Sequence, residues 1–434
     1  MSTYNRVVAA DVNASLAPAI RARLATEMAD PTSEVGAPLV PLRNTSGVRP
    51  PRIATTITTF AAGHGFTVLG GAANAQSFAD DAIDFAIGSQ SVAVEPSITA
   101  PTSIQSPSLP ATDTTGSDVA ITVKIDDTTN VTELILYAAM DVTFANYYQW
   151  TFPVEGLESQ RLIKSGEWVT ITASFGDAAA IGAPTRNGPT VFRLRARTTE
   201  GTTTKFRFNR IGLVSQAATP VVSICTDDIY ASTWTHLRPI LDRYGFSATV
   251  YAIPERAIPS IVSIDRLHQL EDVNGWEIAG HGLTGFLEMA SVAEAEADAV
   301  KSKRWLQSNG FRGPDHYAYV GGQFSPEIER MMRKYFRSCR SISARQPLET
   351  QPPSNAYRIR SMSVSNTTPV ATVTAAITNA VASNSWFVWT LHDIVDGAAG
   401  LGTQYSAADV DAICAHIASL GVQVKLLSAV LSER

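Results

Sequence analysis

Cysteine is scarce in this sequence of 434 residues, and its scarcity excludes several classes of protein. The three cysteines are Cys225, Cys339 and Cys414. Their number is odd, they lie far apart, and no two have the short spacing of a zinc-binding or redox motif. A disulfide framework is therefore excluded, and we expect all three thiols to be buried and reduced.

Excess positive charge and long apolar runs are also missing. The net charge is −6, which argues against a nucleic-acid-binding protein. No apolar run approaches the length of a membrane span. The first residues, Met1 to Arg6, lack the apolar core of a secretory leader, so we expect that the chain is not exported by the usual route.

The N-terminal segment, residues 1–51, has the pattern of an amphipathic helix followed by a linker. Apolar side chains recur at four-residue spacing over residues 8–24, and the linker is rich in Pro, Gly and Ser. A lone helix of this length is marginal in water. We expect it to anchor the chain or to join copies of it, with a trimer favoured; the alternative is that it packs on the rest of its own chain.

The second region, residues 52–218, is dense in short strand patterns and poor in helical ones. Even spacing of this kind is typical of an antiparallel β-sandwich, and we expect a jelly-roll-like one. The serine-, threonine- and proline-rich stretch Glu95–Pro110 is expected to be a loop or crossover. The expected strands are Asp118–Ile125, Glu133–Ala138, Tyr147–Phe152, Glu167–Ala173, Val191–Arg197 and Lys205–Val214.

Aromatic side chains make this second region a candidate carbohydrate-binding module. Tyr147, Tyr148, Trp150 and Trp168 each have a ring that can stack on the face of a sugar. The stronger alternative is that the alternating pair Tyr148 and Trp150 belongs to the apolar core.

Residues 219–434 alternate strand and helix patterns, which predicts a parallel α/β barrel or sheet. Three apolar runs in this region end in groups that bind metals or move protons. Because the carboxyl ends of parallel strands meet at one edge, we expect these groups to share a cleft. They are Asp227 with Asp228, His281, and His392 with Asp393.

Each of these groups alone also has an ordinary structural explanation. A pair of aspartates can cap the helix that follows it. His281 can be a hydrogen-bonded histidine of the core, and His392 is equally unremarkable by itself. Their joint occurrence after three apolar runs is what favours a functional site.

Four short motifs in this order resemble those of the polysaccharide deacetylase family. The resemblance spans about half the chain, from Pro220 to the C-terminus. It implies a distorted (β/α) barrel with its site at the carboxyl ends of the strands. The motifs are Cys225-Thr226-Asp227-Asp228, Glu277-Ile278-Ala279-Gly280-His281, Tyr319-Val320-Gly321-Gly322 and Leu391-His392-Asp393.

The resemblance also implies chemical roles. Asp228 and His281 would bind a divalent metal, zinc being the first choice. Asp227 would act as the general base and His392 as the general acid. Asp393 would fix the tautomer of the neighbouring histidine.

The remaining site residues implied by the resemblance would contact the substrate. Backbone N–H groups near Tyr319, Gly321 and Gly322 would help to hold the oxyanion. Tyr230 and Trp389 complete the candidate substrate-binding residues.

Departures from the family pattern weaken the metal site. The family carries a second histidine four residues after the first, where this chain has Gly285. The third motif has Val320 and Gly321 in place of a proline and an aromatic residue, and its arginine has no clear counterpart. The two remaining ligands are too few for tight zinc binding. His316 is a candidate third ligand.

Residues 21–36 are similar to the N-terminal region of tail proteins of phages that infect actinobacteria. This resemblance implies a virion protein, which reaches the cell surface by lysis and needs no leader. Its partners would be a glycan of the host cell surface, other tail proteins and copies of itself.

Three functions therefore stay open. In the first, the chain is a tail fibre or minor tail protein whose deacetylase-like domain binds, and deacetylates, a host glycan. In the second, it is a bacterial metal-dependent polysaccharide deacetylase with an auxiliary carbohydrate-binding module. In the third, it is a structural tail protein with an inactive barrel.

Overall fold

The computed structural model describes residues 48–154, 161–282, 291–343, 345–400 and 402–432. The chain divides into two units, Met1–Asn44 and Thr45–Arg434. The expected N-terminal helix lies outside the described residues, and so it stays a prediction.

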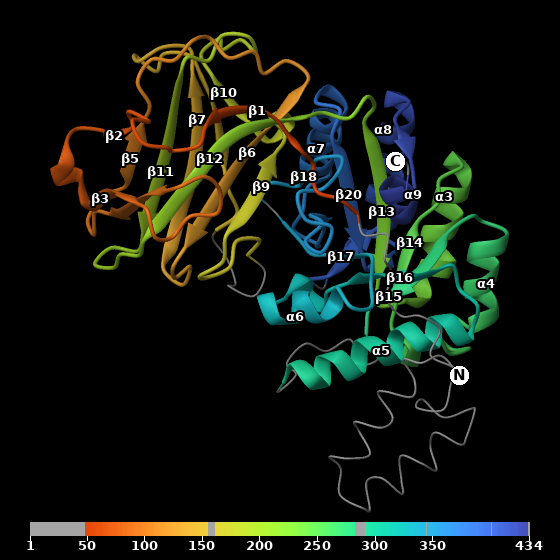
Figure 1. Ribbon diagram of the computed structural model, residues 1–434. Helices are drawn as coiled ribbons and strands as arrows, with labels where there is room; N and C mark the ends of the chain where they lie inside the picture. The colour runs from red at the N-terminus through yellow and green to blue at the C-terminus, as the bar shows by residue number, and fades with distance from the viewer. Residues whose placement is uncertain (1–47, 155–160, 283–290, 344, 401, 433–434) are drawn as a thin grey trace, which may run out of the picture. The chain divides into compact units, whose positions relative to one another are not determined.

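The region before Val221 contains two six-stranded antiparallel sheets (Figure 1). The first sheet has the order β3 (Ala75–Asp81), β4 (Ser91–Pro96), β12 (Phe206–Ser215), β6 (Ser117–Ile125) and β9 (Val169–Ala173), with β1 (Ile53–Thr58) also paired to β12. The second has the order β10 (Ala179–Ile181), β8 (Tyr147–Thr151), β7 (Val131–Ala139), β11 (Val191–Thr198), β5 (Thr102–Gln105) and β2 (Thr67–Val68).

Alternating apolar residues of both sheets form one core. Val119, Ile121 and Val123 of β6 belong to the same buried cluster as Leu134 and Leu136 of β7. This period of two is what the pleat of a strand requires when one face is buried. The expectation of a strand-rich region is thus confirmed, while the jelly-roll connectivity stays a prediction.

The stretch Glu95–Pro110, expected to be a loop or an extended crossover, contains a short strand. This strand is β5, which pairs with β11 and β2. The strand is short, and Thr102 and Ile104 are buried while Ser103 and Gln105 are half-buried. Such a short alternation among serines and prolines gives little signal in the sequence.

Among the aromatic residues of β8, Trp150 lies in the core and the half-buried Tyr148 packs against it. Trp150 is fully buried, and its Nε1 donates a hydrogen bond to the Ser174 carbonyl at 2.8 Å. Tyr148 packs edge-on against Phe175 at 5.1 Å between ring centroids. Trp168 is half-buried and donates from Nε1 to the Asp84 carboxylate. The core alternative therefore describes Trp150.

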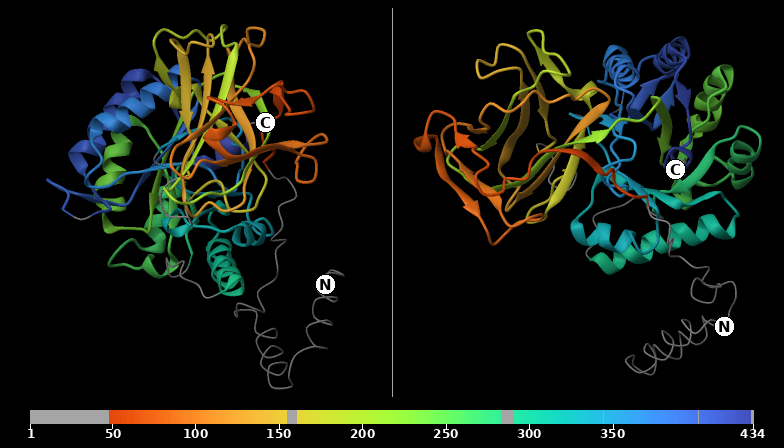
Figure 2. Two further views of the ribbon diagram at one scale, coloured as in Figure 1. Left: turned by 90° about the vertical axis from the view of Figure 1, so that its left-hand side faces the viewer. Right: turned by 45° about the horizontal axis from the view of Figure 1, so that its top comes forward.

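The C-terminal region contains a nine-stranded, mostly parallel sheet that curls into a half-barrel (Figures 1 and 2). Its order is β17 (Ser338–Arg340), β16 (Gly313–Ala318), β15 (Glu277–Gly280), β14 (Thr249–Ala252), β13 (Val221–Asp227), β20 (Trp386–Leu391) and β18 (Leu348–Glu349). Two further strands, β19 (Met362–Ser363) and β23 (Gln423–Val424), pair with β20 and β13. A separate pair is β21 (Asp393–Val395) with β22 (Gln404–Ser406).

Helices cover the outer face of this half-barrel (Figure 2). Ser263, Ser291, Ser325 and Ser406 accept hydrogen bonds from the first turns of α4, α5, α6 and α8, as N-caps do. The helices are α3 (Arg238–Tyr244), α4 (Ile264–Asp272), α5 (Val292–Ser308), α6 (Pro326–Met332), α7 (Val370–Ala382), α8 (Ala407–Leu420) and α9 (Leu427–Ser432), with a short π-helical turn at Thr233–Leu237 and 3-10 turns at Pro254–Arg256 and Val320–Gly322.

The strands of the half-barrel separate two sets of side chains. Ile224 and Val250 point outward and pack with the helices in one cluster. Cys225, Tyr251 and Ala279 point inward and form another with α9. The same alternation places residue 227 on the inner face, where β13 ends.

Polar contacts join the strand-rich region to the half-barrel. The buried Arg358 guanidinium bonds both Glu329 of α6 and Glu167 before β9. Ser174 bonds Ser385 at 2.6 Å between their hydroxyl oxygens. These groups are removed from water in the fold and would be unsatisfied if the two regions separated.

Candidate functional site

The turn after β13 has an unusual backbone. Asp228 has φ 71° and Ile229 has φ 54°, and both values are in the left-handed region. A β-branched residue there is strained, and such strain is typical of functional sites. Complete burial of the Ile229 side chain among the outer helices offsets the cost. The turn keeps Asp228 beside Asp227 at the end of the strand.

His281 faces both aspartates from the end of β15. Its Nε2 lies 3.4 Å from Asp228 Oδ1 and 3.9 Å from Asp227 Oδ2. Its Nδ1 lies 2.8 Å from the carbonyl oxygen of Ala318. A proton on Nδ1 donates to this carbonyl and fixes the ring, so that Nε2 is directed at the carboxylates.

Arg340 is the functional residue that the sequence did not reveal. It lies on β17, is 1 % exposed, and its Nη2 binds the two oxygens of Asp227 at 2.7 and 2.6 Å. Its guanidinium also lies 4.9 Å from the centre of the Tyr251 ring. A signal that the sequence does offer is an arginine between apolar and small residues, because a buried arginine needs a carboxylate partner.

His392 approaches Asp227 from the other side. It follows β20 directly, and its Nε2 lies 3.8 Å from Asp227 Oδ2. That distance is too long for a direct hydrogen bond and leaves both groups free to contact one atom between them. The Nδ1 atom of His392 is buried without a hydrogen-bond partner in the part of the chain that the structure describes.

The role expected of Asp393 is wrong. Its carboxylate accepts a hydrogen bond from the Ser232 hydroxyl at 2.8 Å and from Gln404 Nε2 at 3.1 Å. Those partners turn the side chain away from His392 and tie β21 to the turn at residues 232–237. Asp393 therefore does not fix the tautomer of the histidine.

Opposite charges govern the titration of the site. Burial acts to raise the pKa of Asp228, but His281, with His392 and Arg256, outweighs it and lowers that pKa to about 2. Burial likewise acts to lower the pKa of His281, and Asp227 and Asp228 raise it above its usual value. The site therefore favours an ionised Asp228, and the two carboxylates shift His281 toward its protonated form.

Two of the expected substrate contacts are wrong because the side chains face elsewhere. Trp389 is fully buried among the outer helices, since it alternates with the inward-facing Val388. Tyr319 is 1 % exposed and stacks on Phe324 at 5.2 Å between ring centroids. Tyr230 is half-buried, and its hydroxyl lies 3.4 Å from Asp228 Oδ2.

The backbone at the third motif does not form the expected oxyanion site. The N–H of Gly322 donates to the Tyr319 carbonyl at 2.8 Å, and the N–H of Tyr319 donates to the Arg340 carbonyl at 2.9 Å. These amides hold the turn together. Gly321 and Gly322, with φ 59° and 69°, supply the left-handed backbone that the turn needs.

The donors present do not fit a tightly bound zinc ion. Among the residues that the structure describes, Asp228 and His281 alone have the required position and chemistry, because Asp227 is held by Arg340. No cluster of three metal-binding side chains occurs among the residues with described positions. His316 bonds the Ser338 hydroxyl at 2.8 Å instead of completing the site. Gly285 lies in residues 283–290, outside the described structure.

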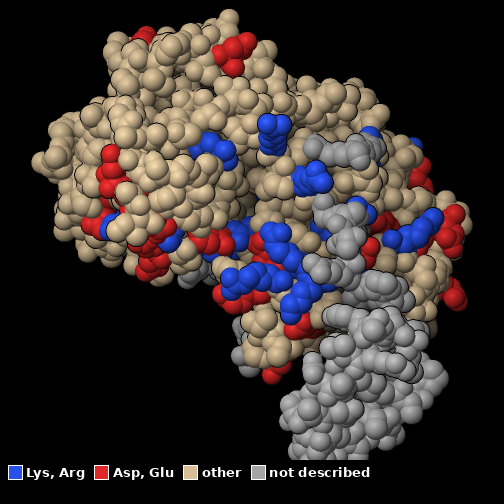
Figure 3. Space-filling model, viewed as in Figure 1, with Lys and Arg blue, Asp and Glu red and all other residues tan. Residues whose placement is uncertain are grey.

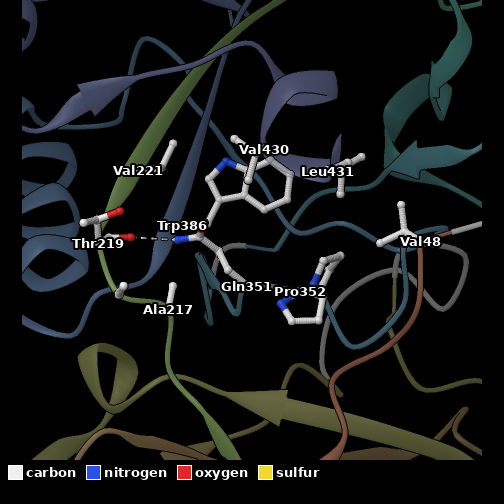
Figure 4. A pocket seen from close by; sticks show the side chains of 11 residues that line it. Val48, Ala217, Thr219, Val221, Gln351, Pro352, Trp386, Val430 and Leu431 are labelled. Atoms are coloured by element: carbon white, nitrogen blue, oxygen red, sulfur yellow. Dashed lines mark hydrogen bonds between the residues drawn. The ribbon is translucent and has the colours of Figure 1, made fainter. Parts of the chain in front are cut away.

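A cavity of about 250 Å³ lies at the other end of the strands (Figure 4). It is lined by the first residues of β13 and β20, Val221 and Trp386, together with Val48. Gln351 donates to the Thr219 carbonyl at its edge. Its lining contains no acid, base or metal ligand, so it is not the candidate site.

Solved structures with some similarity to this chain include carbohydrate esterases. One is the Xyl-CE4 domain of a xylanase from the hindgut metagenome of Trinervitermes trinervoides: 13 % identity, 50 % of this chain and 91 % of that chain, TM-score 0.35. A second is a family 4 acetyl xylan esterase from Clostridium thermocellum in complex with cobalt. It is 15 % identical, the match covers 49 % of this chain and 90 % of that chain, and the TM-score is 0.36. A third is a CE4 family pseudoenzyme from Bacillus anthracis. It is 12 % identical, the match covers 50 % of this chain and 66 % of that chain, and the TM-score is 0.34.

No curated protein matches the chain. The helices within the described ranges are each too short or too polar to span a bilayer. None of these comparisons bears on the tail resemblance, which stays a prediction.

Residues 215–336 match the family model described as polysaccharide deacetylase. A polysaccharide deacetylase-like domain thus lies in the C-terminal half of this chain.

Proposed function

We propose that the C-terminal domain binds an acetylated polysaccharide and removes its acetyl groups slowly. The observation that carries the proposal is the convergence of Asp227, His281 and His392 at the carboxyl ends of three strands. The acetyl group is placed between Asp227 and His392, where both can contact one atom.

The chain's own residues supply acid and base chemistry. Arg340 uses one lone pair on each oxygen of Asp227, which leaves the carboxylate able to accept a proton from a water molecule. His392 lies across from it and donates a proton to the departing amine or hydroxyl. Arg340 also fixes the orientation of the base, because the contact is made to both oxygens.

No step of this proposal uses a bound metal. The two donors Asp228 and His281 do not make a complete set, and protonation of His281 competes with any metal for its Nε2. This is the physical reason for a slow reaction, since the described part of the domain offers no strong means of polarising the acetyl carbonyl.

The metal content of the protein tests this point. We expect wild-type protein to lose zinc on mild dialysis, because a catalytic zinc site usually has three protein ligands. Replacing Gly285 by His should increase zinc retention, measured by elemental analysis, if this position is that of the family's second histidine. A wild-type preparation that keeps one zinc per chain would contradict the account.

Binding and acetate release test the function itself. The full chain should bind N-acetylglucosamine hexamers and bind the fully deacetylated hexamer much less, as measured by calorimetry. Asp227→Asn and His392→Gln should each reduce acetate release at least about 100-fold. Asp265→Asn, which changes an exposed carboxylate on α4, is the matched control. Equal binding of both hexamers, or unchanged release by Asp227→Asn, would refute the proposal.

We further propose that the glycan belongs to a bacterial surface and that the chain works in a phage tail. The support is the similarity of residues 21–36 alone, and these residues lie outside the described ones. Mass spectrometry of purified virions would detect the chain if this setting is right, and its absence from them would exclude it.

A further inference from the structure

Arg256 and Tyr230 form a stacked pair beside Asp228. Tyr230 lies two residues after Asp228, and Arg256 ends the short turn that follows β14. The guanidinium carbon lies 4.2 Å from the centre of the tyrosine ring. Both side chains are half-buried. Two neighbouring strands thus place a cation at the edge of the candidate site.

The position of Arg256 is fixed in advance. Its Nε donates a hydrogen bond to the Ile229 carbonyl at 3.1 Å, and the ring of Tyr230 supports its face. The tyrosine is itself tied to Asp228 by its hydroxyl at 3.4 Å. An arginine held by its Nε and its face presents its Nη atoms, which are the two donors that bind an oxyanion side by side.

Arg256 has no ion pair among the described residues, unlike Arg238, Arg340 and Arg358. On the face drawn in Figure 3, Lys and Arg adjoin Asp and Glu near the lower centre, while other Lys and Arg stand apart from them. Arg238 is the informative contrast, because it also stacks on an aromatic ring, Trp234 at 4.4 Å, but binds Asp242 as well. Stacking on an aromatic ring therefore does not prevent an arginine of this protein from forming an ion pair.

The acids of the site do not neutralise Arg256. Asp227 is bound by Arg340 through both of its oxygens. Asp228 lies 3.4 Å from His281 and contributes to Arg256 only at longer range. The neighbouring Glu255 has Asp298 and Lys301 as its charged neighbours. One cation therefore remains at the edge of the site.

We propose that Arg256, supported by Tyr230, binds an oxyanion on the glycan close to the sugar whose acetyl group enters the site. The ligand class is an acidic acetylated polysaccharide, with a sugar carboxylate or a phosphodiester as the oxyanion. This inference rests on the proposed function and adds to it the charge of the substrate.

Calorimetry with matched oligosaccharides tests the inference without using activity. The probes are a hyaluronan hexasaccharide, in which N-acetylglucosamine alternates with glucuronate, its carboxyl methyl ester, and the neutral N-acetylglucosamine hexamer. A glycerol phosphate oligomer substituted with N-acetylglucosamine distinguishes phosphate from carboxylate. The full chain should bind one of the two acidic probes about 10- to 100-fold more tightly than the neutral hexamer.

Variants then assign the difference to Arg256. Arg256→Met should remove the preference for the acidic probe while leaving affinity for the neutral hexamer within about twofold. Tyr230→Phe keeps the ring and should keep the preference, whereas Tyr230→Leu removes the support and should reduce it. Arg238→Met, which removes the other stacked arginine, should change nothing. The preference should also weaken as salt is added.

The outcomes separate this inference from the function on which it rests. If neither neutral nor acidic acetylated probes bind, the proposed function fails. If the neutral hexamer binds as well as both acidic probes, or if Arg256→Met keeps the preference, the function stands and the inference is overturned. Circular dichroism of each variant shows that a lost preference is not a loss of folding.

Discussion

The ion pair of Arg340 with Asp227 determines how the site is built at the scale of single residues. Both side chains are almost completely buried, at 1 % and 4 % exposed. Burial acts to lower the pKa of Arg340, and the Asp227 carboxylate outweighs it and raises that pKa. The Arg340 charge is therefore stable in the interior because the Asp227 carboxylate lies against it.

Replacing Arg340 by Met should destabilise the protein strongly. The change leaves Asp227 buried without its partner, which costs about 3–5 kcal/mol in comparable cases. Urea unfolding followed by fluorescence measures the change in free energy of unfolding. Adding Asp227→Asn to Arg340→Met should restore part of the loss, because the unpaired charge is then removed. Equal stabilities of the single and double variants would show that the ion pair is not the cause.

The sequence predicted the acids and histidines of the site but not the arginine, for a physical reason. Asp227, His281 and His392 each follow an apolar run, and the end of a parallel strand fixes which edge of the sheet they reach. Arg340 lies within its strand, and only the curl of the half-barrel brings β17 opposite β13. The error at Trp389 is similar: its face is decided by the alternation along β20, which a fully apolar run conceals.

Turns are the elements that hold the strand ends in place. The turn at Val320–Gly322 brings Gly322 against Ile342, where an added Cβ would lie 2.5 Å from a side-chain carbon. The Gly322 carbonyl also accepts a hydrogen bond from the Ser341 hydroxyl at 2.6 Å. The conformation and the close approach both require glycine here.

Gly322→Ala should therefore lower the free energy of unfolding by more than the cost of a left-handed alanine alone. We expect a loss of about 2–4 kcal/mol, since overpacking adds roughly 1–3 kcal/mol to the cost of a left-handed alanine. Gly421→Ala is the control: its φ of 62° is similar, and an added Cβ there meets nothing within 4 Å. That variant should lose only about 1 kcal/mol in thermal or urea unfolding. Similar losses for the two variants would mean that contact with Ile342 is unimportant.

At the element scale, polar caps mark the helix starts that a sequence shows most plainly. Ser291 and Ser325 each accept a hydrogen bond from the first turn of α5 and α6. The helix α7 lacks this signal, because its cap is Pro369 without a side-chain hydrogen bond and its residues are rich in Val and Thr.

At the scale of the whole molecule, buried acids lie near the polar contacts between the strand-rich region and the half-barrel. Asp118 of β6 accepts hydrogen bonds from the Phe175 N–H and the Gln216 side chain. Burial raises its pKa to about 6, although Arg186 and Arg360 act in the opposite direction. Burial also raises the pKa of Asp177 well above its usual value. The folded state therefore binds protons that the unfolded chain releases.

Asp118→Asn should flatten the dependence of stability on pH. The stabilisation from this group is complete below about pH 4 and is lost as pH rises through about 6, so the wild type loses up to about 3 kcal/mol by pH 7. The Asn variant has no group that titrates here, so it cannot lose this stabilisation. Its free energy of unfolding in urea, relative to that of the wild type, should therefore rise from pH 4 to pH 7. Glu200→Gln controls for the change in net charge. A constant difference would contradict the raised pKa.

Deleting residues 1–44 should leave a folded monomer. Thr45–Arg434 forms one of the two units of the chain, and its Val48 packs with the core clusters, so the cut keeps that contact. The apolar stripe of residues 8–24 is the expected means of association. Light scattering of full-length and shortened chains gives the two masses. A shortened chain with the full-length oligomeric state would show that association occurs elsewhere.

The most direct test of the central claim is a crystal structure of the full chain with an N-acetylglucosamine hexamer bound. The account predicts density for a sugar whose acetyl group lies within hydrogen-bonding distance of both Asp227 and His392, with Asp227 still held by Arg340. Sugar density found only on the strand-rich region, with the cleft between Asp227 and His392 empty, would contradict it.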